Sequence, residues 1–343
     1  MKAVYFLGEG KLEIREQPDP VPGPDEVLVR LKASGMCGSD LHHLHGPART
    51  GSELVIEGHE PCGVVESVGS AVRPSEAAPS DRVMVHHYDG CRTCTHCRAG
   101  WTQYCANGRR VFGGLNADGG HANFIRVPAH TLIKLPDSLS FKTGAAISCG
   151  TGTAFGAIKR VGLSADDTVA VFGQGPVGLS VTLLAKAFGA RVIAIDVEDS
   201  RLAMAEKFGA DHLLNGREQD VVAAVRALTR DGDGADKAIE CSGSALARRQ
   251  SIEAVRPWGT ACMVGVSPGP VEVDSDELIA HHKTVLGSLT FGKNEQQACA
   301  AFVAERGLDV ESLFTNEFRL DEAEQAYELF DQRKIGKGVF VFD

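Results

Sequence analysis

Four cysteines lie within a span of fifteen residues, and their spacing is one that binds metal ions. The stretch YDGCRTCTHCRAGWTQYC places them in a C-x2-C-x2-C-x7-C pattern: Cys91, Cys94, Cys97 and Cys105. Tight turns bring the first three thiols together and a longer loop returns the fourth, which is typical of a tetrahedral four-thiolate zinc site. Such a site has no open coordination position, so we expect it to stabilise the fold rather than to perform chemistry.

Two alternatives to zinc are less consistent with the residues around this pattern. Thiols without a metal would be buried as small apolar side chains, but the neighbouring positions are polar: Arg92, Thr93, Thr95, His96 and Arg98. An iron–sulfur cluster of the bacterial ferredoxin type begins with the same run, but its fourth cysteine follows after three residues and precedes a proline. Here the gap is seven residues and Ala106 follows. A structural zinc site is therefore the prediction.

A second group of residues forms a glycine-rich loop that could bind phosphate. In VAVFGQGPVGLSV, Gly173, Gly175 and Gly178 form a G-x-G-x-x-G pattern that encloses Pro176 and Val177. The pattern follows an expected strand and opens an expected helix, as in dinucleotide-binding folds. The first glycine makes the turn, the second lets the backbone approach the pyrophosphate, and the third allows close helix packing. The helix N-terminus then supplies N–H groups for the phosphates.

The acidic residue that such a fold uses to recognise ribose is also present. Asp196 ends the next expected strand, eighteen residues beyond Gly178. Its carboxylate can accept hydrogen bonds from a ribose 2′-hydroxyl and would repel a 2′-phosphate, so the sequence favours NAD over NADP. Arg201 lies five residues further on. It is interpreted equally well as a ligand contact, which would favour NADP, and as a solvated helix residue.

A third group combines the ligand types that a catalytic zinc ion prefers. The segment GMCGSDLHHLHG contains Cys37, and IEGHEPCG contains His59. Polar side chains that could support a metal lie close to them: Ser39, Asp40, His42 and Glu60. A lone cysteine or histidine is more often a buried side chain whose hydrogen bonds are made within the protein. The combination, however, predicts a metal site with three protein ligands and one open coordination position. The third ligand should lie near a domain junction, where AAISCGTGTAFGA places Cys149.

The glycine-rich loop must be positioned by a parallel α/β unit. Six short apolar runs between residues 165 and 290 are predicted to be strands: TVAVFG, RVIAID, DHLLN, DKAIEC, TACMVGV and KTVLGSLT. Apolar residues at helical spacing fill the connections after the first two, in PVGLSVTLLAKAFGA and DSRLAMAEKFGA. Alternating strands and helices imply a doubly wound parallel sheet, and six strands suit a complete dinucleotide-binding fold.

The candidate metal ligands lie mostly in a different kind of unit. Residues 1–130 contain β-rich pieces separated by glycine and proline: DEVLVRLKAS, CGVVESVG, DRVMVHH and ANFIRVP. They predict an irregular, mostly antiparallel β unit. The C-terminal segment contains a helical stretch, DEAEQAYELFDQRK, and a closing strand, GVFVFD. From the residues alone, this segment could return to either unit.

Composition excludes several classes of function and compartment. Lys and Arg number 35 against 45 Asp and Glu, and the net charge of −10 is spread without basic blocks, which argues against nucleic-acid and anionic-membrane partners. Ten cysteines in 343 residues is not the density of a disulfide scaffold. No apolar run approaches a signal-peptide core or a membrane span. We therefore expect a cytoplasmic protein with reduced thiols.

Taken together, the motifs resemble those of the medium-chain, zinc-dependent alcohol dehydrogenases, a family of alcohol and polyol dehydrogenases. CGSDLH, GHE, the four-cysteine lobe, SCGTGTAFGA, GQGPVG and VIAID occur in the family's order and at close to its spacing. The resemblance implies a GroES-like, mostly-β catalytic domain at 1–150, with the zinc lobe at about 88–110, completed by a return segment at 290–343. It implies a Rossmann domain at 151–289, an active site in the cleft between the domains, and a homodimer or homotetramer.

The resemblance also implies which residues bind the catalytic metal. Cys37, His59 and Cys149 correspond to the zinc ligands, with water or substrate oxygen in the fourth position. Glu60 corresponds to an acidic residue that approaches the metal in some members. With the four-cysteine lobe, this makes two zinc ions per subunit.

Further residues correspond to the proton relay and the coenzyme site. Ser39 and His42 match the relay from substrate to solvent, and Asp40 matches a residue that orients a zinc-ligating imidazole. Val264 and Val266 match positions whose backbone meets the nicotinamide carboxamide, although they are interpreted equally well as strand core. The implied reaction interconverts an alcohol with an aldehyde or ketone and transfers a hydride to or from NAD. Zinc would lower the pKa of the substrate hydroxyl.

Departures from the family pattern leave the substrate open. Gly38 stands where liver-type members carry arginine, and CGSDLHHLHG resembles the polyol and threonine dehydrogenase branch, whereas Cys149 resembles the alcohol dehydrogenases. Primary and secondary alcohols, diols, polyols and amino alcohols all fit. Two alternatives from other classes are a zinc-free nicotinamide-dependent reductase and a non-catalytic zinc-bearing binding or electron-transfer module.

Five histidines are candidates for lining the cleft, although solvated or core roles are favoured for them: His43, His45, His86, His87 and His121.

Overall fold

The computed structural model describes residues 1–114 and 116–343, and the chain divides into two compact units. Unit 1 comprises Met1–Gly152 and Phe291–Asp343, and unit 2 comprises Thr153–Thr290. The chain therefore leaves unit 1 once and returns to it at the C-terminus. These divisions fall beside the predicted boundaries at residues 150 and 289. No helix in the described part of the chain has the length and apolar character that a membrane span requires.

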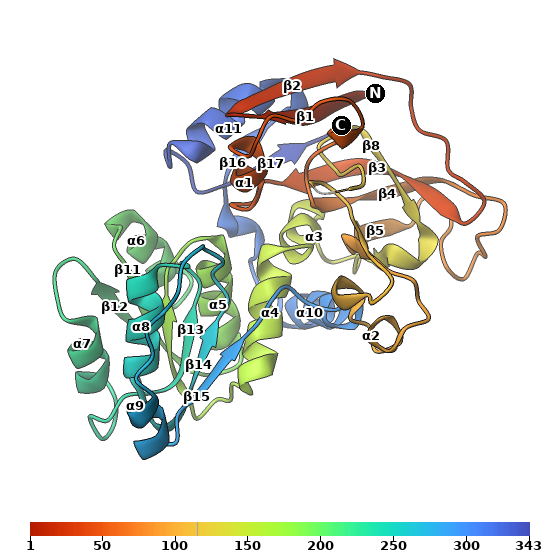
Figure 1. The fold of residues 1–343 in the computed structure, drawn as a ribbon. Helices are drawn as coiled ribbons and strands as arrows, with labels where there is room; N and C mark the ends of the chain where they lie inside the picture. Colours follow the sequence, from red (N-terminus) through yellow and green to blue (C-terminus); the bar gives the residue numbers. More distant parts are fainter. Residues whose placement is uncertain (115) are drawn as a thin grey trace. The chain divides into compact units, whose positions relative to one another are not determined.

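Unit 2 is built on a six-stranded parallel sheet (Figure 1). Its strands are β10 (Thr168–Phe172), β11 (Arg191–Asp196), β12 (His212–Asn215), β13 (Ala235–Glu240), β14 (Val255–Met263) and β15 (Thr284–Gly287). They lie in the order β12-β11-β10-β13-β14-β15, and every neighbouring pair is parallel. This is the doubly wound order with its switch point between β10 and β13, where such sheets bind ligands beyond the carboxyl ends of the strands. The prediction of a six-stranded parallel sheet is confirmed.

Helices cover both faces of this sheet (Figure 1). Their bounds are α4 (Gly150–Val161), α5 (Pro176–Ala187), α6 (Asp199–Lys207), α7 (Val221–Ala227), α8 (Ala245–Glu253) and α9 (Ser275–Ala280). One core cluster joins apolar side chains of the strands, such as Phe172 and Ile193, to Val221, Val225 and Ile252 of α7 and α8. All five residues of β10 are buried, as expected for a central parallel strand covered on both faces.

Unit 1 contains a seven-stranded sheet that is antiparallel apart from one pair. Its path runs β16 (Phe314–Phe318), β17 (Lys337–Val341), β3 (Glu26–Gly35), β4 (Glu60–Val68), β5 (Arg82–Val85) and β9 (Leu132–Lys134), and β8 (Phe124–Pro128) pairs with β3. Only β16 and β17 pair in parallel. The C-terminal segment thus enters the sheet of this unit, with β17 beside β3.

The remaining elements of unit 1 surround this sheet. A hairpin is formed by β1 (Lys2–Gly8) and β2 (Lys11–Glu16), and β6 (Tyr88–Asp89) pairs with β7 (Arg110–Val111) in the cysteine lobe. The helices are α1 (Asp40–Leu44), α2 (Thr95–Arg98), α3 (Phe141–Ile147), α10 (Lys293–Arg306) and α11 (Ala323–Asp331). Short 3-10 turns are η1 (Gly51–Glu53), η2 (Thr102–Tyr104), η3 (Ala129–Thr131), η4 (Glu311–Leu313) and η5 (Leu320–Glu322).

One core cluster of unit 1 ties the C-terminal helix to the N-terminal hairpin. Tyr327 of α11 packs with Phe6 of β1, Met36 after β3 and Phe340 of β17. The rings of Tyr327 and Phe6 meet edge to face, with centroids 4.9 Å apart. This packing brings α11 to the part of unit 1 that carries Cys37 and Asp40.

Candidate metal and coenzyme sites

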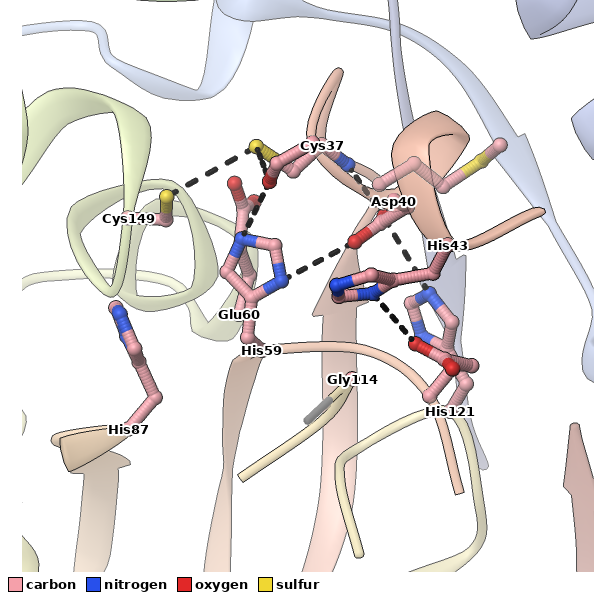
Figure 2. A network of polar contacts seen from close by, with 12 residues as sticks. Cys37, Asp40, His43, His59, Glu60, His87, Gly114, His121 and Cys149 are labelled. Carbon is pink, nitrogen blue, oxygen red and sulfur yellow. Dashed lines mark hydrogen bonds and ion pairs between the residues drawn. The ribbon is translucent and has the colours of Figure 1, made fainter. Parts of the chain in front are cut away.

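Four potential metal ligands converge in unit 1 (Figure 2). Cys37 follows the end of β3, His59 and Glu60 stand at the start of β4, and Cys149 lies between α3 and α4. One ligand atom from each residue lies within 4.8 Å of the ligand atoms of the other three. Three segments that are distant in the sequence therefore bring together the three residues that the sequence predicts as ligands, with a carboxylate beside them.

The distances between these atoms fit a tetrahedral zinc ion. The sulfur atoms of Cys37 and Cys149 are 3.9 Å apart. Two thiolates bound at about 2.3 Å to one tetrahedral ion would be about 3.8 Å apart. The hydroxyl of Ser39 donates to the Cys37 sulfur at 3.2 Å and lies 3.4 Å from Nε2 of His59. Sulfur, imidazole and carboxylate donors are the set that zinc prefers.

The carboxylate of Asp40 contacts two of these ligands, His59 and Cys37. Its Oδ1 lies 3.1 Å from Nδ1 of His59, and its Oδ2 accepts a hydrogen bond of 2.8 Å from the backbone N–H of Cys37. Nδ1 of His59 is thereby engaged, and Nε2 is the nitrogen that faces the other ligands (Figure 2). This is the orienting contact that ligating histidines usually make.

Protonation in the metal-free protein follows the charges of this cluster. A hydrogen bond with Cys149 lowers the pKa of the Cys37 thiol well below its ordinary value against the effect of burial, and His59 contributes to the same shift. Burial opposes protonation of His59, but Asp40 and Cys37 raise its pKa well above the usual range. These two shifts favour a thiolate at Cys37 and a protonated imidazole at His59. Because metal ligands must be deprotonated, binding of a cation would displace the remaining protons.

Glu60 is held by a lysine from the C-terminal strand. Nζ of Lys337 lies 2.7 Å from the carboxylate of Glu60 and donates to the carbonyl of Met36 at 2.9 Å, and both charged side chains are buried. Burial raises the pKa of Glu60 to about 7, and Lys337 opposes that shift. The lysine therefore compensates the negative charge that Glu60 places beside two sulfur atoms.

The two residues of the predicted proton relay differ in their surroundings. Ser39 is exposed and its hydroxyl contacts both Cys37 and His59. His42 is exposed on α1, and its side chain forms no hydrogen bond or ion pair within the described residues. The structure thus brings Ser39 to the ligand cluster and leaves His42 in solvent.

The four-cysteine lobe forms the second cluster of potential ligands. The sulfur atoms of Cys91, Cys94, Cys97 and Cys105 all lie within 4.8 Å of one another. Backbone N–H groups point at two of them: Cys91 N–H donates to the Cys105 sulfur and Cys94 N–H to the Cys91 sulfur, each at 3.3 Å. Hydrogen bonds from Thr93 and Cys94 lower the pKa of Cys91 to about 5. These donors favour thiolates, which is the state that binds zinc.

The glycine-rich loop of unit 2 has the shape that its sequence predicts. Gly173 has a left-handed φ of 87°, and a side chain at Gly178 would collide with the carbonyl oxygen of Gly173 at 1.8 Å. A side chain at Gly175 would meet nothing within 4 Å, so the space above this position is open to a ligand. Gly175 caps α5, and Pro176 and Val177 are its first residues. The N-terminus of α5 therefore offers the N–H groups that bind phosphate.

The other predicted coenzyme residues lie at the carboxyl ends of the strands, with one difference. Asp196 ends β11, and Arg201 on α6 lies 3.7 Å from its carboxylate. The strand predicted at 260–266 instead runs from Val255 to Met263, so Val264 and Val266 both lie beyond its end. Val264 is buried, but Val266 is 71% exposed, which rules out strand core as its role. The loop leaves the sheet here because Val264 N–H and Gly265 N–H both bind the carbonyl of Glu240.

Several residues near the ligand cluster carry no signal in the sequence. Lys337 and Tyr327 come from the C-terminal segment, and no motif marks them. The sequence favours a core or solvated role for His87, but its ring lies 5.4 Å from that of His59 and its Nδ1 lies 3.1 Å from the carbonyl oxygen of Ser148. Burial lowers the pKa of His87 well below its ordinary value.

Of the other histidines considered, His86 and His121 are buried, whereas His45 is exposed beside Asp331.

Two family patterns match this chain. Residues 23–137 match the alcohol dehydrogenase GroES-like domain, and residues 176–305 match the zinc-binding dehydrogenase domain. The first match confirms the GroES-like unit that the resemblance implied.

Three relatives each match 95% or more of this chain. A zinc-type alcohol dehydrogenase-like protein of Escherichia coli, YphC, whose role is uncharacterized, is 36% identical over 353 residues, covering 100% of this chain and 99% of the relative. An alcohol dehydrogenase of Cupriavidus necator is 32% identical and covers 98% of this chain and 96% of the relative. L-idonate 5-dehydrogenase of Vitis vinifera is 32% identical and covers 95% of this chain and 90% of the relative.

Solved structures of dehydrogenases also match nearly the whole of this chain. Alcohol dehydrogenase TADH from Thermus sp. ATN1 superposes with a TM-score of 0.92 at 32% identity, covering 99% of each chain. A dehydrogenase from Sinorhizobium meliloti bound to NADP has a TM-score of 0.89 at 30% identity, covering 99% of each chain. An NAD-dependent alcohol dehydrogenase has the same TM-score and identity, covering 100% of each chain. With two separate ligand clusters, a dinucleotide-binding sheet and relatives matched from end to end, this chain belongs to the medium-chain, zinc-type alcohol dehydrogenase family.

Proposed function

We propose that this protein is a zinc-dependent alcohol dehydrogenase that interconverts an alcohol with its aldehyde or ketone and uses a nicotinamide coenzyme. The observation that carries this proposal is the convergence of Cys37, His59 and Cys149, with sulfur atoms spaced as two zinc ligands would be. Glu60 is close enough to be a fourth ligand, and its pairing with Lys337 favours leaving that position to water or substrate.

The residues around the ligand cluster would accept the hydroxyl proton of the alcohol and transfer it to solvent. A zinc ion held by Cys37, His59 and Cys149 supplies Lewis acidity that lowers the pKa of the substrate hydroxyl. Ser39 touches both Cys37 and His59, so its hydroxyl can accept that proton while it donates its own toward solvent. His42 is exposed, so its imidazole could pass the proton to water. The coenzyme supplies the hydride acceptor.

A second zinc ion would belong to the four-cysteine lobe. No substrate could reach a metal that four thiolates already enclose, so this ion would stabilise residues 88–110 rather than react. The two clusters support the proposed count of two zinc ions per subunit.

NAD is the proposed coenzyme, with NADP less favoured. Asp196 presents an ionisable carboxylate at the end of β11, where it would bind ribose hydroxyls and repel a 2′-phosphate. Arg201 reaches this carboxylate at 3.7 Å, so part of its charge is already compensated. The solved relatives include one bound to NADP and one described as NAD-dependent, and the choice rests on Asp196.

The proposed substrate is a small primary, secondary or polyhydroxy alcohol. The relatives include alcohol dehydrogenases, an L-idonate 5-dehydrogenase and proteins described as probable D-xylulose reductases. Polyol, diol or amino-alcohol oxidation is therefore the second candidate. A zinc-free reductase is disfavoured because such a protein would not need a cysteine–histidine–cysteine cluster with an orienting aspartate.

We further propose that the protein is a homodimer or homotetramer in the cytoplasm. β15 is the last strand of the unit 2 sheet, so one of its edges is unpaired within the described residues. Val285 on this strand and Leu289 after it are 39% and 49% exposed. An exposed apolar edge strand is prone to pair with another chain, and a second copy would cover it. The ten cysteines are free thiols, and only Cys62, Cys262 and Cys299 are buried, which suits a reducing compartment.

Metal analysis and a substrate panel test the proposal together. The purified protein should contain two zinc ions per chain and should reduce NAD when supplied with members of a panel of primary, secondary, polyhydroxy and amino alcohols. The spread of rates across the panel decides between the two substrate candidates. Absence of zinc combined with activity would favour the reductase, and iron with visible absorbance would indicate an electron-transfer protein.

A further inference from the structure

A chain of four buried side chains leads away from His59. Asp40 lies next to His59, with Oδ1 3.1 Å from Nδ1 (Figure 2). The hydroxyl of Tyr327 is 2.8 Å from Asp40 Oδ2, and Nε2 of His121 is 2.7 Å from that hydroxyl. The hydroxyl of Ser34 is 2.8 Å from Nδ1 of His121. The four residues come from α1, α11, the segment before β8, and β3, so the chain joins four separate parts of unit 1.

One arrangement of hydrogen atoms satisfies the three hydrogen bonds that join Asp40, Tyr327, His121 and Ser34. Oδ2 of Asp40 lies 2.8 Å from the backbone N–H of Cys37, which can only donate, so this oxygen is an acceptor. Tyr327 must therefore donate to Asp40. The same hydroxyl then accepts from Nε2–H of His121, which burial keeps neutral by lowering its pKa to about 4. Nδ1 of His121 is left as an acceptor for the hydroxyl of Ser34.

The chain is closed to solvent. Ser34, Asp40 and His121 are 0% exposed and Tyr327 is 1% exposed. A proton that entered from His59 would find no exit at the far end, whereas Ser39 and His42 reach solvent directly. A buried polar chain whose members are hydrogen-bonded to one another fixes the positions of those members. This geometry suits orientation of a ligand and does not suit proton transport.

We propose that Tyr327 and His121 are positioning residues of the metal centre: they hold Asp40 as an acceptor, and Asp40 in turn fixes His59 in the tautomer whose Nε2 is free for the metal. This inference rests on the proposed function, because it takes Cys37, His59 and Cys149 as the ligands. Mutation of a residue that holds a metal ligand in place commonly weakens metal binding by about 10- to 100-fold.

The surroundings of Tyr327 make the removal of its hydroxyl a specific test. Its ring is held by Phe6 at a centroid distance of 4.9 Å and by Phe340 at 6.2 Å. A phenylalanine at this position would keep these contacts and lose only the two hydrogen bonds. Tyr5 offers a matched control, because its hydroxyl binds Gln17 at 2.6 Å and has no contact with the chain of residues behind His59.

The first experiment compares Tyr327→Phe with Tyr5→Phe and with the unmodified protein. Zinc affinity at the cysteine–histidine site is measured by competition with a chelator, and the absorption spectrum is recorded after cobalt substitution. Tyr327→Phe should bind zinc about tenfold more weakly and shift the cobalt bands, with an unchanged circular dichroism spectrum. Tyr5→Phe should match the unmodified protein. The pH profile of kcat should keep its shape in Tyr327→Phe, and a displaced profile would indicate proton transfer and overturn the positioning role.

A second experiment needs no variant. Nitrogen NMR of the histidine rings in the unmodified zinc-bound protein should show His121 protonated at Nε2 and His59 at Nδ1. The opposite tautomer at His121 would overturn the inference even if Tyr327→Phe failed to fold. If the unmodified protein bound no zinc at Cys37, His59 and Cys149, the proposed function itself would fail. If it bound zinc and Tyr327→Phe bound equally well with the same cobalt spectrum, only the positioning role would be wrong.

Discussion

The carboxylate of Asp196 accepts a hydrogen bond of 2.6 Å from the backbone N–H of Gln174, which ties the end of β11 to the glycine-rich loop. Its other oxygen accepts from Val197 N–H at 2.7 Å and Glu198 N–H at 3.0 Å. An ionised carboxylate offers about four acceptor positions. Three are used by the backbone, so one is left for a ribose hydroxyl. Asp196 therefore shapes the loop, and under the proposed function it would also select the coenzyme.

Replacing Asp196 should separate these two roles. Asp196→Ala should lower the preference for NAD over NADP by about tenfold or more, because a charged hydrogen bond to the ribose is lost and the repulsion of a 2′-phosphate disappears. Asp196→Asn keeps an oxygen for Gln174 N–H and should retain more thermal stability than Asp196→Ala. The ratio of kcat/KM for the two coenzymes measures the effect. Asp199→Ala, on the adjacent helix, is the control, and an unchanged ratio in Asp196→Ala would contradict the assignment.

Removing one sulfur from the cysteine–histidine cluster should stop catalysis without affecting the coenzyme site. Cys149→Ser should reduce alcohol oxidation by at least about 100-fold, because the metal loses a ligand. The dissociation constant for NAD should remain within about twofold, since the glycine-rich loop belongs to unit 2. Cys299→Ser is a matched control: this thiol is buried in the same unit and donates to the carbonyl of Thr151. Normal turnover by Cys149→Ser would show that the ligand assignment is wrong.

The lobe cluster should respond differently to the same kind of change. Cys97→Ser should lower the yield of folded protein and reduce zinc content from two ions to one, because a structural zinc site contributes directly to folding. Molecules that do fold should keep a substantial part of their activity. Expression yield, metal content and rate per zinc-loaded chain are the measurements. Full yield with two zinc ions would contradict a structural role for this cysteine.

Two buried histidines should make the protein sensitive to acid. Burial lowers the pKa of His86 and of His121 to about 4, from an ordinary value near 6.5. Because the unfolded chain binds these two protons first, the free energy of unfolding should fall as pH drops from about 6.5 to about 4. Below that range both states are protonated and their contribution ends. The two groups together add a slope of up to about 2.7 kcal/mol per pH unit.

Urea unfolding between pH 7.5 and 4 measures this slope. His86→Gln should make the slope smaller, because a glutamine at this position can still bond to Gln296 or Thr102 and has no proton to gain. Equal slopes in the unmodified protein and the variant would mean that His86 does not titrate in this range.

The exposed edge of β15 should be needed for assembly. Val285→Lys places a charge on this edge and should shift the protein from oligomer toward monomer in analytical ultracentrifugation. Val21→Lys is the control, because Val21 is 77% exposed in a loop of unit 1. A protein that keeps its oligomeric state in Val285→Lys assembles through another surface.

Elements with a strong local pattern could be predicted from the sequence. The six strands of unit 2 are continuous apolar runs separated by helical repeats, and all six form in the structure. The glycine-rich loop and the four-cysteine lobe are short motifs whose geometry depends on nearby residues. By contrast, β1 is not among the predicted strands. Five of its seven residues are buried, so its apolar run does not alternate as a half-exposed strand would.

The support of the ligand cluster could not be predicted, because it depends on single residues far apart in the chain. Lys337 meets Glu60 across 277 positions, and Tyr327 meets Asp40 across 287. A lysine next to two glycines in KIGKGVF suggests a solvated position, and only the placement of β17 beside β3 buries it. Histidines such as His121 carry no local signal that separates a core residue from one in a polar chain.

The return of the C-terminal segment to unit 1 sets an order of events during synthesis. Residues Thr153–Thr290 form one continuous unit and can fold as soon as they leave the ribosome. The unit with the cysteine–histidine cluster lacks Tyr327, Lys337 and β17 until α11 and β17 have been translated. Loading of a metal at this cluster would therefore be a late step, and translation that stopped after residue 290 but before β17 would yield a chain with a complete dinucleotide-binding unit and an unsupported ligand cluster.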